Sequence, residues 1–146
     1  KTIWDAREKL LLAIQKSTPK MDEVDVSVPI NKIPLVLHRI EELEKEEDMR
    51  IPNFGHAGDG NLHIYLCSDD MTDDEFAKKG DIIISELYKT ARSVDGNMSG
   101  EHGVGYARQN YYEDFYGKDY TDLLRKVKGL FDPKGILNPD KIFPLD

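Results

Sequence analysis

Apolar residues recur along the chain with two different periods, and these periods predict a mixture of helices and strands. Spacings of three and four residues favour helices over residues 4–16, 31–48, 72–92 and 120–130. Polar and apolar residues alternate over Asp25–Pro29, which is typical of a strand. The apolar segments Ile51–Ala57 and Leu62–Cys67 flank the tetrapeptide Gly58-Asp59-Gly60-Asn61, and Asp-Gly is a strong hairpin signal.

Residues at the expected helix ends agree with this division. Asn31 is expected to cap the second helix, and Pro34 suits its first turn, where a missing N–H is not needed. Thr72 and Glu75 form a capping box for the third helix. The apolar face of that helix is expected to carry Ile82, Ile83, Ile84, Leu87 and Tyr88. A further short helix is expected over Tyr106–Tyr112, and the last helix is expected to carry Leu123, Leu124, Val127 and Leu130 on one face.

The order of these elements predicts the fold class. A helix and a strand are followed by a second helix, a hairpin, a long helix and further helices. Because a hairpin pairs its strands antiparallel, the sheet is not purely parallel. The sequence therefore predicts an α+β fold rather than a doubly wound one, with helices covering one face of the sheet.

Composition narrows the class of protein. The 146 residues suit one domain, and 28 acidic against 20 basic residues give a net charge of −8, which argues against nucleic acid as a partner. No apolar run is long enough to span a bilayer. The single cysteine, Cys67, excludes a disulfide framework and a cysteine-based zinc motif, so a cytoplasmic location is expected. Since the chain starts with Lys1, it is expected to be a fragment or a processed product.

Two histidines flank the predicted hairpin turn. With Asp59 and Gly60 at its centre, His56 would lie directly opposite His63, on the same face of the sheet. Directly opposed residues have Cβ atoms about 4.5–5.5 Å apart. Two imidazoles at that separation can share one metal ion. The alternative is a cross-strand aromatic pair without a ligand.

A second segment can complete such a site. Glu101 and His102 lie between Gly100 and Gly103 in a glycine-rich stretch, and a carboxylate is a suitable third ligand. His102 beside the metal can act as a general base. The alternative is a surface loop with an incidental acid and base. The residues alone indicate a metal site with an adjacent base, and they attach no reaction to it.

Three segments carry a resemblance to a known family. Residues 55–63 (GHAGDGNLH), 99–105 (SGEHGVG) and 132–143 (DPKGILNPDKIF) resemble, in this order, three signatures of the FAD-linked oxidases. The relevant branch includes D-lactate dehydrogenase, the flavin subunit of glycolate oxidase and D-2-hydroxyglutarate dehydrogenase. The resemblance covers Trp4 to Phe143. It implies that residues 1–146 are the C-terminal substrate or cap domain, ferredoxin-like with a C-terminal helical segment, and that an N-terminal FAD-binding domain is absent.

The resemblance also implies a ligand set and a reaction. It assigns a divalent metal, with zinc as the expected ion, to His56, His63 and Glu101. The metal would bind the hydroxyl and carboxylate of a small D-2-hydroxy acid. His102 would take the hydroxyl proton while a hydride leaves C2 for the flavin, which yields the 2-oxo acid.

Further roles follow from the same resemblance. Arg7 would pair with the substrate carboxylate, and Asn138 and Lys141 would lie near the flavin. The chain departs from the hydroxyglutarate enzyme at three positions, where that enzyme has a polar residue, a lysine and an asparagine; here they are Leu11, Glu23 and Tyr65. These departures favour a smaller acid of the lactate or glycolate type.

Two other functions remain open at this point. One is a stand-alone metal-binding module without redox chemistry. The other is a non-catalytic interaction domain that binds a partner through the acidic helix end Glu41–Asp48. An electron-acceptor subunit and a homo-oligomer are compatible with the sequence, which identifies neither. On the flavoenzyme hypothesis the isolated chain is expected to be inactive.

Overall fold

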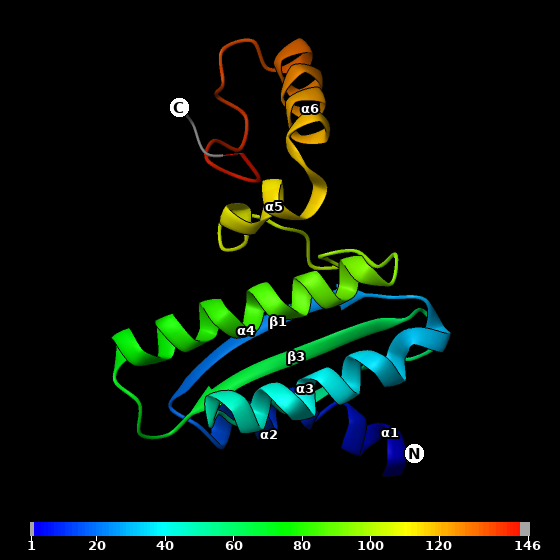
Figure 1. Cartoon of the computed structure of the whole chain (residues 1–146), viewed down its shortest axis with the longest axis vertical. Helices are drawn as coiled ribbons and strands as arrows, with labels where there is room; N and C mark the ends of the chain where they lie inside the picture. The colour runs from blue at the N-terminus through cyan, green and yellow to red at the C-terminus, as the bar shows by residue number, and fades with distance from the viewer. Residues whose placement is uncertain (1, 144–146) are drawn as a thin grey trace.

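A three-stranded antiparallel sheet lies at the centre of the computed structural model, which describes residues 2–143 (Figure 1). Strand β1 spans Lys20–Ser27, β2 spans Asn53–His56 and β3 spans Asn61–Ser68. Their spatial order is β1-β3-β2, so the long strand β3 is central. The predicted α+β class is confirmed. The order β-α-β-β-α is that of a ferredoxin-like unit, with a single bridge, Ser27 to Asn97, beyond the outer edge of β1.

One face of the sheet is covered by two long helices, α3 (Ile33–Glu47) and α4 (Asp73–Ser93), as Figure 1 shows. Every second residue of β1 and β3 points toward them, because side chains alternate between the faces of a strand. The resulting core contains Val24, Val26, Leu62, Ile64, Leu66, Val36, Ile40, Leu43, Ile83, Ile84 and Leu87. Burial of this apolar surface is the main force that holds the helices on the sheet.

The ends of α3 and α4 test the capping predictions. Thr72 and Glu75 form the predicted capping box at the start of α4. Asn31 does not cap α3; it lies within a short 3₁₀ helix, Ile30–Lys32, and α3 begins without a side-chain cap. The predicted apolar face of α4 is buried except for Ile82, which is 42% exposed because it points away from the sheet.

The predicted N-terminal helix is interrupted. Helix α1 spans Thr2–Arg7 and α2 spans Leu10–Lys16, with a turn at Glu8 and Lys9 between them. Arg7, Glu8 and Leu11 line a cavity together with side chains of β1, β2 and β3 that point away from the core. This segment therefore lies beside the second face of the sheet.

Residues 112–143, which we call the C-terminal arm, stand away from the sheet (Figure 1). The arm contains α5 (Tyr112–Tyr116), α6 (Lys118–Phe131) and a turn-rich tail. The helix predicted over Tyr106–Tyr112 is replaced by turns and a 3₁₀ helix, Gln109–Tyr111. Helix α6 is confirmed, and its apolar face is mostly exposed: Leu123 is 55% and Leu130 81% exposed, while Leu124 packs against the core.

None of the helices within residues 2–143 is both long enough and apolar enough to cross a bilayer.

Candidate active site

The second face of the sheet carries acidic, histidine and aromatic side chains from all three strands. Glu23 and Asp25 on β1 lie opposite Tyr65 and His63 on β3, and Phe54 on β2 lies opposite His63 on the other side. These residues alternate with core residues along each strand, so they share one face. The alternation that buries the apolar side chains in the core thus places the acidic and histidine side chains together on the opposite face of the sheet.

The predicted register of the hairpin is wrong by two residues. His56 lies opposite Asn61 rather than His63. The loop consists of residues 57–60, and Gly60 occupies its last position with a φ of 72°. Its Cα approaches the residue that follows β1 so closely that a Cβ atom on it would lie 1.9 Å from the Val28 carbonyl oxygen. This contact, and the hydrogen bond from the Val28 N–H to the Gly60 carbonyl, fix the longer loop.

The shift preserves the shared face of the two histidines. A change of two residues returns a strand side chain to the same side of the sheet. His56 and His63 are therefore diagonal neighbours, with ring centroids 5.5 Å apart. With the corrected register, both imidazoles can still reach one common point.

Glu101 supplies a carboxylate at that point. Its Oε1 atom lies 3.1 Å from Nε2 of His63 and 3.5 Å from Nε2 of His56. One ligand atom from each of these three residues lies within 4.8 Å of the others. Two imidazole nitrogens and a carboxylate oxygen are a donor set that suits zinc and leaves coordination positions open. The three residues that the sequence indicated are brought together, and their arrangement fits a divalent cation.

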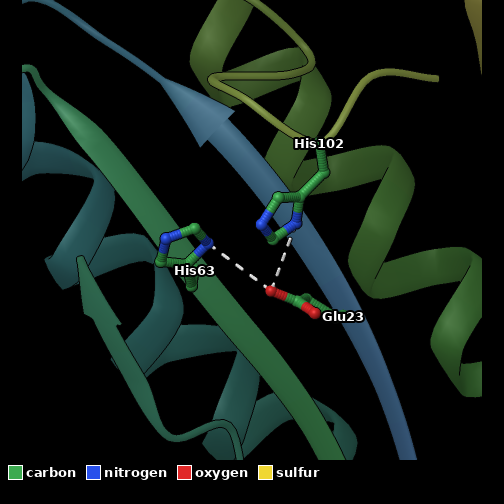
Figure 2. A group of neighbouring side chains, drawn as sticks. All are labelled: Glu23, His63 and His102. Carbon is green, nitrogen blue, oxygen red and sulfur yellow. Dashed lines mark ion pairs between the residues drawn. The ribbon is translucent and has the colours of Figure 1, made fainter. Parts of the chain in front are cut away.

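A second group of this kind shares His63. Glu23, His63 and His102 also offer ligand atoms within 4.8 Å of one another (Figure 2). The rings of His63 and His102 are stacked with centroids 4.9 Å apart. His63 is the member common to both groups, with one ring nitrogen near Glu101 and the other near Glu23.

Asp25 anchors the loop that carries Glu101 and His102. Its Oδ2 atom accepts hydrogen bonds from the Ser99 hydroxyl at 2.8 Å and from the backbone N–H groups of Gly100, Glu101 and His102 at 3.0, 3.0 and 2.8 Å. Burial raises the pKa of Asp25, but the hydrogen bonds from His102, Glu101 and Ser99 outweigh it, so the pKa lies below its ordinary value. The carboxylate stays ionised and holds the loop against β1.

Sequence reasoning missed this role of Asp25. The alternation of Asp25 with Val24 and Val26 shows that it leaves the core face. Nothing in the sequence, however, links it to Ser99, which lies 74 positions further along the chain. The bridge between Ser27 and Asn97, which joins the end of β1 to the segment after α4, supplies that link.

Arg7 lies at the rim of the same site. Its Nη2 atom is 2.9 Å from Nδ1 of His56. A cavity of about 200 Å³ opens beside it, lined by Arg7, Glu8, Leu11, Glu23, Phe54, His63, Tyr65 and His102. Arg7 is the one arginine or lysine among these lining residues. The cavity thus offers one permanent positive charge next to the two histidines of Figure 2.

Tyr65 and Glu23 close the cavity on the sheet side. The Tyr65 hydroxyl donates a hydrogen bond to Oε1 of Glu23 at 3.0 Å. Burial and the neighbouring Glu23 carboxylate both raise the pKa of Tyr65, so the phenol keeps the proton that it donates. The three positions at which the chain departs from the hydroxyglutarate enzyme, Leu11, Glu23 and Tyr65, all line this cavity.

Asn138 and Lys141 lie elsewhere, in the tail of the C-terminal arm. Lys141 donates to the Pro139 carbonyl oxygen at 2.9 Å, and its ammonium lies over the ring of Tyr106. Asn138 adopts a left-handed backbone with a φ of 46°. None of their described contacts joins them to the histidines, so their proximity to a flavin stays a prediction.

Comparison with known proteins identifies relatives over nearly the whole chain. Residues 1–142 match the family described as FAD linked oxidases, C-terminal domain. The chain is 45% identical over 142 residues to D-lactate dehydrogenase of Anaerostipes hadrus, which covers 97% of the chain and 30% of that protein. It is 37% identical over 144 residues to D-2-hydroxyglutarate dehydrogenase of Stutzerimonas stutzeri, covering 97% and 31% respectively.

A third relative has the same extent. The glycolate oxidase subunit GlcD of Bacillus subtilis is 34% identical over 144 residues, which cover 99% of the chain and 30% of that subunit. The chain therefore spans less than a third of the length of each of these relatives. What they share with it is one segment of a much longer polypeptide.

Proposed function

The chain belongs to the family of FAD linked oxidase C-terminal domains, and from this we propose that it is the substrate- and metal-binding part of a larger FAD-dependent dehydrogenase. We propose that residues 1–146 form the cap domain and that a domain N-terminal to them binds most of the FAD. The reaction is the oxidation of a small D-2-hydroxy acid to the 2-oxo acid. FAD, when bound, supplies the acceptor for the hydride that leaves C2 of the substrate.

The metal site of this proposal consists of His56, His63 and Glu101. Support comes from the approach of both Nε2 atoms to one oxygen of Glu101, at 3.5 and 3.1 Å. A divalent cation such as zinc, when bound there, supplies Lewis-acid polarisation of the substrate hydroxyl. His63 is buried and Glu101 is half-exposed, so the site is rigid on the sheet side and open toward the cavity.

Arg7 holds the substrate carboxylate in this proposal. A guanidinium presents two N–H groups that match the two oxygens of a carboxylate. In this structure Arg7 faces the imidazole of His56 rather than a carboxylate, which would match the guanidinium better. The cavity of about 200 Å³ suits an acid of a few carbon atoms.

His102 accepts the proton of the substrate hydroxyl. It lies at the cavity, next to Glu101 in the sequence, and its backbone is fixed by the hydrogen bond to Asp25. A base within reach of the reacting hydroxyl is needed because the hydride leaves more easily from an alkoxide than from an alcohol. The chain's own residues thus bind, orient and deprotonate the substrate.

The carboxylates of the cavity favour a substrate with a single carboxylate. Glu8 and Glu23 line it together with the apolar Leu11, and Arg7 is the one permanent cation among the lining residues. A second substrate carboxylate would face like charges rather than a cation. Lactate or glycolate is therefore the type of substrate that we propose.

The C-terminal arm supports the existence of a further domain. Six of its apolar residues are exposed in the described chain: Leu123, Val127, Leu130, Phe131, Ile136 and Leu137. Many exposed apolar residues on one short segment are typical of an interaction site. We propose that this face packs against the flavin domain, which would also bring Asn138 and Lys141 near the cofactor.

The convergence of His56, His63 and Glu101 beside Arg7 is the observation that carries the proposal. It is tested on the native, unfragmented polypeptide. We expect a mass well above 16.7 kDa, a flavin spectrum that D-lactate or glycolate bleaches, and loss of this bleaching on chelation with recovery on addition of zinc. A native mass near 16.7 kDa without flavin would refute the flavoenzyme proposal.

That second outcome would favour a different function. The proposed ligand set is complete within this chain, so a divalent-metal module without redox activity needs no further domain. Zinc binding by the 146-residue chain, lost in both His56→Ala and His63→Ala, would then establish the module. The absence of such binding would exclude it.

A further inference from the structure

One oxygen of Glu23 faces two imidazoles at once, as Figure 2 shows. Oε1 of Glu23 lies 3.4 Å from Nδ1 of His63 and 3.5 Å from Nδ1 of His102. The three residues come from three segments: β1, β3 and the loop that follows α4. The sheet and the Asp25 anchor bring them together, since neighbouring residues of the sequence supply none of these contacts.

The other nitrogen of each ring faces Glu101. Nε2 of His63 lies 3.1 Å and Nε2 of His102 lies 3.8 Å from Oε1 of Glu101. A neutral imidazole carries its one proton on either Nδ1 or Nε2, and the other nitrogen then holds a lone pair. Which nitrogen carries the proton is set by the acceptor that the ring faces. The two carboxylates therefore compete for the tautomer of both rings.

We propose that Glu23 is a positioning residue that keeps His63 and His102 in the tautomer with the proton on Nδ1. The lone pair of His63 Nε2 is then directed toward a divalent cation, and that of His102 Nε2 toward the substrate hydroxyl. This inference rests on the metal site of the proposed function. It adds a residue that belongs neither to the ligand set nor to the base.

Glu23 is better placed for this role than Asp25, the other carboxylate near His63. Oδ1 of Asp25 lies 3.9 Å from Nδ1 of His63, and Oδ2 of Asp25 is already used by the loop. Nδ1 of His63 is buried and has no hydrogen-bond partner in this structure, so it needs an acceptor. Oε1 of Glu23 is the nearer of the two carboxylate oxygens.

Glu23 is itself held in position. The Tyr65 hydroxyl donates to the same Oε1 atom at 3.0 Å, and Arg108 donates to the Glu23 carbonyl oxygen at 2.7 Å. A partner that orients a metal-binding histidine must have a fixed place, because its effect depends on the direction of the hydrogen bond. Tyr65 constrains the carboxylate of Glu23, and Arg108 constrains its backbone.

The test compares three variants of the 146-residue chain. Glu23→Leu removes the acceptor, and Glu23→Gln keeps a weaker, uncharged one. Glu8→Gln is the matched control, since Glu8 lines the same cavity and none of its described contacts involves a histidine. Circular dichroism first establishes that each variant keeps its secondary structure.

Two measurements report on Glu23 independently. NMR spectra that correlate the ring protons with the ring nitrogens through two-bond ¹H–¹⁵N couplings give the tautomers of His63 and His102. They are recorded on the metal-free chain, at a pH where the imidazoles are neutral. We expect His63 and His102 to carry the proton on Nδ1 in the wild type and in Glu8→Gln. In Glu23→Leu we expect this preference for Nδ1 over Nε2 to be lost. Calorimetric titration with zinc should give a Kd about 10- to 100-fold weaker in Glu23→Leu, an intermediate value in Glu23→Gln, and a change within about twofold in Glu8→Gln.

The outcomes separate this inference from the proposed function. A wild-type tautomer with the proton on Nε2 of His63, or equal zinc affinity in Glu23→Leu and Glu8→Gln, would overturn the role of Glu23 and leave the metal site intact. A wild type that does not bind zinc, but whose tautomers depend on Glu23, would overturn the metal site and leave the role of Glu23 standing.

Discussion

The sheet with its two helices and the C-terminal arm are both built from amphipathic elements, yet they bury very different amounts of apolar surface. Val24 and Ile64 of the sheet are fully buried, whereas Leu130 and Phe131 of the arm are 81% and 80% exposed. The periodicity of α6 predicts a helix with an apolar face as clearly as that of α4 does. The periodicity does not tell what covers that face. Within the described residues Leu124 packs against the core, while Leu123, Val127 and Leu130 stay exposed.

Tyr112 and Phe115 join the arm to the core, whereas the tail after α6 keeps its local structure by hydrogen bonds. Asp132 accepts from the backbone N–H groups of Ile136 and Leu137 at 3.0 Å each, and Lys128 donates to it at 2.8 Å. The motif that reads as a family signature at residues 132–143 is thus, in this structure, a turn closed on one carboxylate. The sheet region contains the candidate site, whereas the arm exposes apolar residues of the kind that a partner covers.

The largest expected difference between the two regions is chemical. In the full-length protein, His102→Gln should lower kcat by about 10²–10⁴-fold, because it removes the proposed base. The zinc content should not change, since His102 is outside the proposed ligand set. Steady-state kinetics with D-lactate and metal analysis measure the two effects.

The matched change in the arm is Lys126→Met. We expect it to alter kcat by less than about tenfold, because Lys126 is an exposed residue of α6 without a described contact to the site. Equal losses in the two variants would mean that the chemistry does not belong to the sheet region alone.

The next difference is one of packing. Leu66→Ala should lower the free energy of unfolding by about 2–5 kcal/mol, because Leu66 is fully buried and a cavity would remain. Leu130→Ala in the same 146-residue chain should cost less than about 0.5 kcal/mol. Urea unfolding of both variants measures the contrast. A cost for Leu130→Ala that approaches that of Leu66→Ala would show that the chain covers its own arm in solution.

Substitution of Asp25, which anchors the loop, should have an intermediate effect on the free energy of unfolding. Asp25→Asn replaces the ionised acceptor of four hydrogen bonds, and hydrogen bonds to charged groups contribute about 1.5–3 kcal/mol. We expect a loss of about that size in urea unfolding. Asp59→Asn, in the exposed hairpin loop, is the control and should be nearly neutral. If the two substitutions cost the same, Asp25 does not hold the loop.

The smallest expected effect concerns the surface of the arm. Phe131→Ser should cost about 1–2 kcal/mol in the full-length protein and almost nothing in the 146-residue chain, because only the former contains the proposed flavin domain. Ile30→Ser, at an exposed residue outside the arm, should not distinguish the two forms. Thermal unfolding of both variants in both forms provides the comparison. A cost for Phe131→Ser that is the same in both forms would contradict the docking of the arm.

Local patterns predicted most of the elements, and long-range contacts decided what the patterns missed. The capping box at Thr72 and the hairpin that joins β2 to β3 depend on neighbouring residues, and both elements are present. The hairpin register depends on the contact of Gly60 with Val28, which directly follows β1. No local rule contains that contact, so the predicted pairing of His56 with His63 was wrong although the shared face was right.

The candidate site shows the same limit. The glycine-rich segments pointed to His56, His63, Glu101 and His102, which the structure brings together. The sequence indicated Glu23 and Tyr65 as departures from the hydroxyglutarate enzyme, but not that they touch each other. Asp25 was missed because its four donors lie on a loop more than 70 positions away. Such partners become visible once the order of the strands is known.

The proposed function depends above all on the binding of one divalent cation by His56, His63 and Glu101. Anomalous diffraction at the zinc absorption edge, from crystals of the protein grown with zinc, locates such an ion. We expect a single strong peak within bonding distance of Nε2 of His56, Nε2 of His63 and a carboxylate oxygen of Glu101. A peak at Glu23, His63 and His102 instead, or no peak at either group, would contradict it.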